Sequence, residues 1–286
     1  MPRIAYVNGR YLPHRDAAVH IEDRGYQFAD GVYEVCEVAH GNLMDATRHL
    51  DRLDRSLREL RIGWPMHRSA LVMVMREVVT RNRVRSGLVY VQVTRGVASR
   101  DFVFPENVAP SLVVTAKKVD PGTTARRAET GIKVITLPEN RWERVDIKSV
   151  GLLPNVLAKQ SAKEAGAHEA WFVDIDGNVK EGGSSNAWIV TKDGCLVTRP
   201  AEFGILRGIT RTTLFEVAAK LGLTIEERGF SVAEAKAARE AFISSATTIA
   251  MPVVEIDGTP VANGHPGSVV HSLRRAFFDV AEKTPA

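Results

Sequence analysis

Two short segments contain the residues best suited to chemistry. Lys148 lies within the run Arg144–Gly151, and further along the chain Glu181 precedes the small hydrogen-bonding residues of Gly182–Asn186. A lysine amine becomes a nucleophile once burial or a nearby cation lowers its pKa. A carboxylate beside a ring nitrogen keeps that nitrogen protonated, which makes the ring an electron sink. The two segments are therefore compatible with binding of an aldehyde cofactor, although by spacing alone they also fit a surface lysine and an exposed turn.

The first part of the chain, residues 1–118, is predicted to form an α/β sandwich. Asn8-Gly9 indicates a hairpin between strands at 4–7 and 10–12, because both turn residues accept positive φ. A helix over 45–62 follows from apolar residues on one face, namely Leu50, Leu53, Leu57 and Leu60. The other elements expected here are a helix at 69–82 and strands at 31–38, 88–94 and 111–115.

The second part, residues 132–286, is predicted to be barrel-like, because short strands outnumber helices. Residues 119–131 contain Pro121, Gly122 and charges without periodicity, so they are expected to form an interdomain linker. Ser231 and Glu234 have the spacing of a helix capping box. Strands are expected at 132–136, 169–173, 187–190 and 195–198, and helices at 155–165, 210–221, 232–238 and 268–281.

The composition is that of an ordinary globular protein. Its 286 residues, 44% hydrophobic and 25% charged, can bury a full core. The net charge of +4 comes from basic residues scattered among acids, and the densest basic cluster is Arg76, Arg81, Arg83 and Arg85. Because no aromatic residues are interleaved with this cluster, it predicts a solvated helix face and not a nucleic-acid surface.

Cysteine use and hydropathy bear on the location of the protein. Cys36 and Cys195 lie far apart, with no histidine at metal-ligand spacing, so they predict buried thiols in a reducing compartment and no metal site. The amino terminus lacks the apolar core of a signal peptide. No apolar run approaches the roughly 20 residues that span a bilayer. A cytoplasmic protein with no membrane partner is expected.

Several segments together resemble the class IV pyridoxal-phosphate-dependent aminotransferases, and most closely the D-amino-acid (D-alanine) aminotransferases. The similarity runs over nearly the whole chain, through residues 22–28, 30–35, 49–53, 92–96, 146–149, 181–186, 208–211 and 251–258. It implies a fold-type IV enzyme with an N-terminal α/β sandwich and a C-terminal α/β pseudo-barrel. It also implies transfer of an amino group from a D-alanine-like D-amino acid to a 2-oxo acid, such as 2-oxoglutarate, by a ping-pong mechanism.

The resemblance assigns two residues to the reactive part of pyridoxal 5'-phosphate. Lys148 matches the lysine that binds the aldehyde covalently and then carries a proton to and from the substrate Cα. Glu181 matches the partner of the pyridine nitrogen, whose protonated form a carboxylate stabilises.

Phosphate binding is expected from three places in the chain. Ile209 and Thr210 begin a helix whose free N–H groups and partial positive charge favour an anion, although Thr210 also fits a simple helix cap. Arg52 matches the family's phosphate arginine, and without the resemblance it would fit a surface salt bridge. The turn 244–248 matches a further phosphate-binding turn, but carries Ala246 where relatives have threonine. Within this turn the residues assigned to the cofactor are Ser245 and Thr247.

Recognition of the substrate carboxylate is expected from Tyr33 and Arg100. They match the family's tyrosine and the arginine of an Arg-x-His pair, whose planar fork suits a carboxylate. Phe102 occupies the histidine position, which removes one donor from the expected carboxylate site. Because the family's Arg-x-His pair reaches across from a partner subunit, a homodimer with shared active sites is expected.

Other functions are compatible with the same residues. Within the fold the alternatives are a branched-chain L-amino-acid aminotransferase, an (R)-amine transaminase and an aminodeoxychorismate lyase, which would release pyruvate without an amino acceptor. An alternative from another class is a pyridoxal-phosphate-binding protein without turnover. The sequence does not decide the substrate side chain or the amino acceptor.

Overall fold

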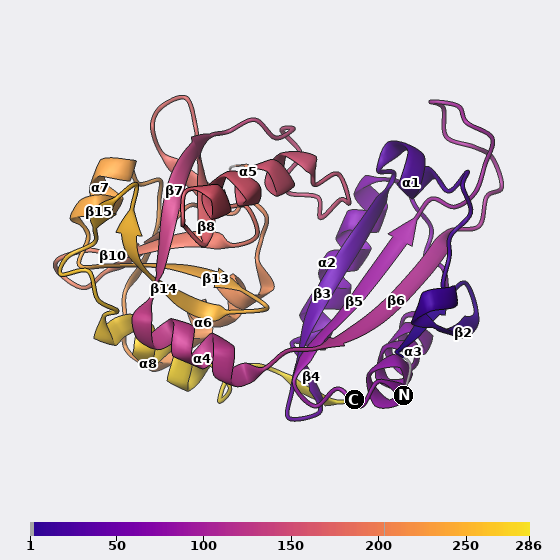
Figure 1. The fold of residues 1–286 in the computed structure, drawn as a ribbon, viewed down its shortest axis with the longest axis horizontal. Coiled ribbons are helices and arrows are strands. Elements are labelled where there is room, and N and C mark those ends of the chain that lie inside the picture. Colours follow the sequence, from indigo (N-terminus) through magenta and orange to yellow (C-terminus); the bar gives the residue numbers. More distant parts are fainter. Residues whose placement is uncertain (1–2, 203) are drawn as a thin grey trace. The chain divides into compact units, whose positions relative to one another are not determined.

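A computed structural model describes residues 3–202 and 204–286 as two compact units (Figure 1). The first unit comprises the chain through Pro121 together with Ile147–Gly151 and Glu282–Ala286, and the second comprises Gly122–Asp146 and Leu152–Ala281. The division between them falls within the predicted linker. The segment that contains Lys148 and the last residues of the chain group with the first unit, whereas the predicted boundaries put them in the second.

The predicted linker contains a helix. Residues Pro121–Thr130 form α4, in which Ala128 alone is buried and packs in the core of the second unit. A helix with one buried residue has no apolar periodicity for the sequence to display. Proline in its first turn is consistent with a helix start, because the missing N–H would have no partner there.

The first unit is built on a seven-stranded antiparallel sheet in the order β16-β4-β3-β5-β6-β1-β2. Alternate residues of the central strands share one core with the buried faces of α2 and α3, so both helices cover the same face of the sheet. The bounds are β1 Ile4–Val7, β2 Arg10–Pro13, β3 Gly31–Ala39, β4 Asn42–Met44, β5 Gly87–Thr94, β6 Ser111–Lys118, β16 Lys283–Pro285, α1 Arg24–Phe28, α2 Ala46–Glu59 and α3 Arg68–Arg81.

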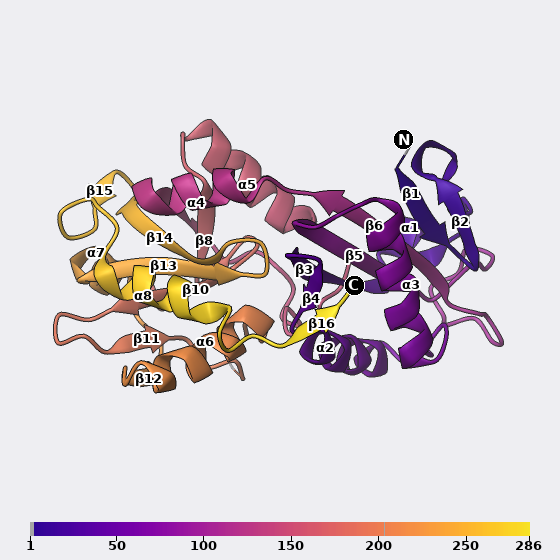
Figure 2. The ribbon, with the colours of Figure 1, turned by 90° about the horizontal axis from the view of Figure 1, so that it is seen from below.

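The second unit contains a closed six-stranded barrel, as the fold prediction required. The strands follow one another as β10-β13-β14-β7-β8-β9, and β9 pairs again with β10 to close the ring. Figure 2 shows α6 and α8 side by side against this barrel. The bounds are β7 Ile132–Pro138, β8 Glu169–Val173, β9 Val179–Gly182, β10 Asn186–Val190, β11 Leu196–Thr198, β12 Ile225–Glu227, β13 Glu240–Ser245, β14 Ile249–Ile256, β15 Thr259–Pro260, α5 Leu153–Glu164, α6 Ile209–Lys220, α7 Val232–Ala237 and α8 Ser268–Phe277.

Most predicted elements are confirmed, including the hairpin at Asn8-Gly9 and the helix over 45–62, which begins and ends within that range as α2. The capping box at the start of α7 is half formed. The Ser231 side chain accepts a hydrogen bond from the Glu234 N–H at 3.1 Å, but the Glu234 carboxylate pairs with Arg228. Strands β13 and β14 were missed because their residues are buried on both faces and show no period-two alternation.

Candidate active site

Lys148 lies on a short segment that runs along the edge of β3 in the first unit. The Tyr33 N–H donates to the Lys148 carbonyl at 3.0 Å, and the Val150 N–H donates to the Gly31 carbonyl at 3.0 Å. Ile147 anchors the segment in the hydrophobic core. These main-chain bonds fix the position of the lysine, and its Nζ atom lies 4.2 Å from the centre of the Tyr33 ring. Two residues predicted from separate parts of the sequence are thus in contact.

Tyr90 of β5 packs against the Tyr33 ring and fixes its orientation. The two rings stack with centres 5.6 Å apart, and the Tyr90 hydroxyl donates to Gln92 at 2.7 Å. Burial, together with Tyr33, raises the pKa of Tyr90 to about 12. Tyr90 therefore stays a neutral hydrogen-bond donor over the physiological pH range, and Tyr33 has a defined orientation beside Lys148.

Arg52 of α2 is oriented by a buried carboxylate from β3. Its Nε and Nη2 atoms donate to the two oxygens of Glu34 at 2.7 and 2.8 Å, and His49 Nδ1 lies 2.7 Å from the same carboxylate. Burial opposes ionisation of Glu34, but Arg52 and His49 outweigh it and hold the pKa of this carboxyl well below its usual range. A bidentate pair of this kind fixes the guanidinium plane. The arginine predicted to bind phosphate is therefore anchored by a buried carboxylate, with 10% of its own side chain exposed, and it is not a free surface residue.

Glu181 is a buried carboxylate at the end of β9 in the second unit. It accepts hydrogen bonds from Arg141 Nη1 at 2.7 Å, from Asn186 Nδ2 at 3.1 Å and from the Leu206 N–H at 3.1 Å. Burial raises the pKa of Glu181 above its usual value, and the Arg141 guanidinium opposes that shift. The exposed turn that the sequence left open for this residue is excluded.

Arg141 is itself shared between two carboxylates. Its Nε and Nη2 atoms donate to Glu139 at 2.8 and 2.6 Å, and its guanidinium lies 4.3 Å from the centre of the Phe172 ring. Burial opposes ionisation of Glu139, yet hydrogen bonds from Arg141, with the charge of Lys180 beyond it, lower the pKa of Glu139 to about 2. Glu139 therefore holds Arg141 in place independently of Glu181.

Strand register gathers the predicted residues of the second unit at one edge of the barrel. Glu181 of β9 pairs with Asn186 of β10, which in turn pairs with Ser244 of β13. The start of α6 lies against the same row, because a Cβ atom built on Gly208 would come within 2.0 Å of the Asn186 side-chain oxygen. Asn186 also donates to the Leu206 carbonyl at 2.9 Å. The predicted pyridine and phosphate residues of this unit are therefore neighbours.

The first turn of α6 has the features of an anion site. Gly208 is its N-cap and provides no side-chain hydrogen bond to the first turn, which is also the case at α2, α5 and α8. The N–H groups of a first turn have no partner within the helix, and they carry partial positive charge. Thr210 is buried at this end, where its hydroxyl is a further donor. The simple capping role that the sequence allowed for Thr210 is not observed.

The turn between β13 and β14 carries several hydroxyl groups. Ser245 Oγ lies 3.0 Å from Thr247 Oγ1 and 2.9 Å from Thr248 Oγ1. Ser244 accepts a hydrogen bond from Trp188 Nε1 at 2.9 Å, which fixes the strand end. Ala246 has no hydroxyl group, and the hydroxyl groups of the turn come instead from Thr247 and Thr248, the next two residues.

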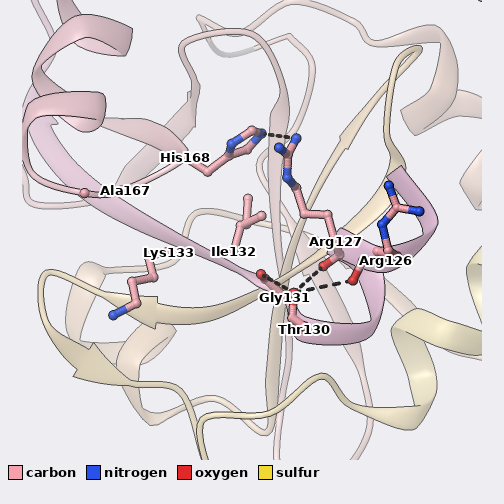
Figure 3. Close-up of a pocket in the computed structure, with 9 residues that line it drawn as sticks. Arg126, Arg127, Thr130, Gly131, Ile132, Lys133, Ala167 and His168 are labelled. Atoms are coloured by element: carbon pink, nitrogen blue, oxygen red, sulfur yellow. Dashed lines mark hydrogen bonds between the residues drawn. The ribbon is translucent and has the colours of Figure 1, made fainter. Parts of the chain in front are cut away.

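A pocket of about 420 Å³ elsewhere in the second unit does not include the predicted residues. It lies between the end of α4 and the start of β7, and in Figure 3 the Arg127 guanidinium points to His168, whose Nε2 atom is 3.3 Å away. Among the residues described, no group of three metal-ligating side chains is found. In the same part of the chain, no helix is long and apolar enough to cross a membrane.

Comparisons with known proteins identify the family and agree with the fold. The family described as Amino-transferase class IV matches residues 31–256, so the chain belongs to the class IV aminotransferases. It is 38% identical to a D-alanine aminotransferase of Listeria innocua, over 96% of this chain and 94% of that protein. It is 37% identical to a D-alanine aminotransferase of Staphylococcus aureus, over 95% of each. The PLP-bound form of a hypothetical aminotransferase from Mycobacterium tuberculosis superposes with a TM-score of 0.83 at 25% identity, covering 96% of this chain and 98% of that one.

Proposed function

We propose that the protein is a D-amino-acid transaminase that uses pyridoxal 5'-phosphate. The observation that carries the proposal is the lysine segment on β3, which holds the Lys148 amine beside Tyr33. The similarity to two D-alanine aminotransferases supports a D-alanine-like donor substrate. The acceptor would be a 2-oxo acid such as 2-oxoglutarate, in a ping-pong sequence of two half-reactions.

The residues fit the cofactor at three chemically different groups. The Lys148 amine suits an aldehyde, and the buried carboxylate of Glu181 suits a protonated ring nitrogen. The uncapped start of α6 at Ile209 and Thr210 suits a phosphate, for which Arg52 is the cation. Hydroxyl groups of the turn after β13, those of Ser245 and Thr247, add further donors. When bound, the cofactor supplies an electron sink for negative charge at the substrate Cα.

The side chains of this protein would then have separate tasks. Lys148 would hold the cofactor and, as a free amine, would take the proton from the substrate Cα and pass it on. Glu181, fixed by Arg141 and Asn186, holds the proton on the ring nitrogen. Tyr33 and Arg100 bind the substrate carboxylate and so set the orientation of its Cα–H bond.

A homodimer with shared active sites is part of this proposal, because the family's Arg-x-His pair acts across subunits. Chains carrying Lys148→Ala and chains carrying Arg100→Ala should each be poorly active alone. After the two are unfolded and refolded together, mixed dimers should recover part of the wild-type rate, since one of their sites has both residues intact. No recovery in dimers that are demonstrably mixed would show that each chain supplies its own arginine.

The substrate class is tested by a half-reaction without acceptor. Cofactor-loaded protein is mixed separately with D-alanine, D-glutamate, L-leucine and (R)-1-phenylethylamine, and the absorbance of the cofactor is followed. We expect the visible band to bleach with the D-amino acids alone. Bleaching by L-leucine or by the amine instead would keep the family and overturn the substrate. A band that no donor bleaches would indicate a binding protein without turnover.

A further inference from the structure

Arg100 lies in the irregular segment that joins β5 to β6, and this segment is held at three points. Arg24 of α1 is buried and donates through Nη1 to the Asp101 carbonyl at 2.6 Å. The Phe102 ring lies 5.5 Å from the Phe28 ring. The Arg95 guanidinium lies 3.6 Å from the centre of the Phe104 ring. The backbone that follows Arg100 is therefore held in place although it has no regular secondary structure.

Asp30 links two of these anchors. Its carboxylate accepts from Arg24 Nε at 2.8 Å and from Arg95 Nε at 2.7 Å. Arg95 also donates to the carbonyls of Leu60 and Arg61 after α2. The two arginines thus have carboxylate and carbonyl partners that tie the segment to the body of the first unit.

Arg100 has a different environment. Its guanidinium lies 4.9 Å from the centre of the Phe28 ring and 5.6 Å from that of Phe102. Within residues 3–202 and 204–286 it forms no hydrogen bond or ion pair, and it is exposed. An arginine that rests on ring faces keeps its N–H groups available, and their planar fork matches a carboxylate.

We propose that Phe28 and Phe102 are positioning residues that hold the Arg100 guanidinium ready for a carboxylate. The inference rests on the proposed function, in which Arg100 binds the substrate. Phe102 occupies the position at which the resemblance implies a histidine, so the site has one hydrogen-bond donor fewer. Its ring instead orients the donor that remains, the Arg100 guanidinium. Carboxylate binding in this enzyme then relies on Tyr33 and on an Arg100 guanidinium that two aromatic rings hold from one side.

The first test separates binding from chemistry in the half-reaction with D-alanine. Phe102→Leu, which keeps an apolar side chain and removes the ring, should raise the half-saturating D-alanine concentration about fivefold, with a limiting rate within about twofold of wild type. Phe102→Tyr should retain the wild-type value, because the ring face remains. Phe28→Leu should likewise raise the half-saturating D-alanine concentration, and Phe28→Tyr should keep the wild-type value. Arg100→Ala should raise the concentration by about a hundredfold or more.

Tyr26→Leu is the matched control. Tyr26 is an exposed aromatic residue on the same helix as Phe28 and makes no ring contact with Arg100, so its variant should saturate like wild type. Equal half-saturation for Phe102→Leu and wild type would overturn the proposal. So would a fall in limiting rate without a change in saturation, or a Phe102→Tyr variant as weak as Phe102→Leu.

A second readout does not depend on turnover. Phenylglyoxal modifies arginine, and its rate of reaction at Arg100 is measured by peptide mass spectrometry with increasing propionate, a plain carboxylate. Propionate should protect Arg100 in wild type, and half-protection should need about fivefold more propionate in Phe102→Leu. If no D-amino acid reacts but this difference is found, the proposed function fails and the aromatic support of Arg100 stands. Absence of protection in wild type would overturn the carboxylate site itself.

Discussion

Lys148→Ala should lower the rate of amino-group transfer by a factor on the order of 10⁴ or more. The variant loses the amine that attaches the cofactor and also the group that carries the Cα proton, and no neighbouring residue described here replaces both. The fold should survive, because the segment is held by main-chain bonds between Lys148 and Tyr33 and between Val150 and Gly31. The measurement is the steady-state rate with D-alanine and 2-oxoglutarate, together with a thermal unfolding curve.

Two further variants make this result specific. Lys163→Ala removes an exposed lysine of α5 and should retain the wild-type rate. Lys148→Arg keeps a cation over the Tyr33 ring but no nucleophilic amine, so it should be as inactive as the alanine variant. Borohydride reduction of loaded wild-type protein should add the mass of the cofactor less one oxygen atom to the peptide that contains Lys148, because condensation loses water and reduction adds two hydrogens. Addition at another lysine, or a Lys148→Ala rate within about tenfold of wild type, would refute the assignment.

Local features of the sequence predicted much of the fold. The hairpin at Asn8-Gly9 depends on two adjacent residues, and α2 depends on a leucine stripe that the structure buries at Leu50, Leu53 and Leu57. Strands β13 and β14 were not predicted. The residues of β13 and β14 are apolar without alternation, so only the closed barrel explains why they are strands.

The partners of the candidate site residues could not be predicted in the same way. Arg141 meets Glu181 across 40 positions of sequence, and Arg52 meets Glu34 across 18. Such ion pairs are decided by tertiary packing and leave no spacing signal in the chain. Asn186 falls within the segment 181–186 that carried the resemblance, but its link between Glu181 and Leu206 becomes visible only with the strand register.

The role of Phe102 that the sequence suggests differs from the one that the structure suggests. In the sequence it is a missing histidine, and so a lost donor. In the structure its ring packs on Phe28 beside the Arg100 guanidinium. The sequence contains no cue for this contact, because Phe28 and Phe102 come from separate segments that Arg24 joins through the Asp101 carbonyl.

Glu181→Gln should lower the limiting rate of the half-reaction by about 10²–10³ while cofactor affinity changes much less. Glutamine has nearly the same shape, but it is neutral and cannot stabilise a proton on the ring nitrogen. The structural cost should be moderate, because Arg141 keeps its two hydrogen bonds to Glu139 when the charge at position 181 is lost. The rate is measured by stopped-flow absorbance with D-alanine, and the affinity by titration of the cofactor into protein from which it has been removed.

The shared arginine provides the control that separates charge at the ring from general loosening of the network. Glu139→Gln removes a carboxylate from the same Arg141 but leaves Glu181 ionisable, so its limiting rate should stay within about tenfold of wild type. The guanidinium then has Glu181 as its one remaining charged partner among the hydrogen bonds described here, which favours the ionised form of that carboxylate. If Glu139→Gln is as slow as Glu181→Gln, the loss reflects displacement of Arg141. If Glu181→Gln turns over at the wild-type rate, Glu181 is not the partner of the ring nitrogen, and the buried ion pair with Arg141 serves the fold alone.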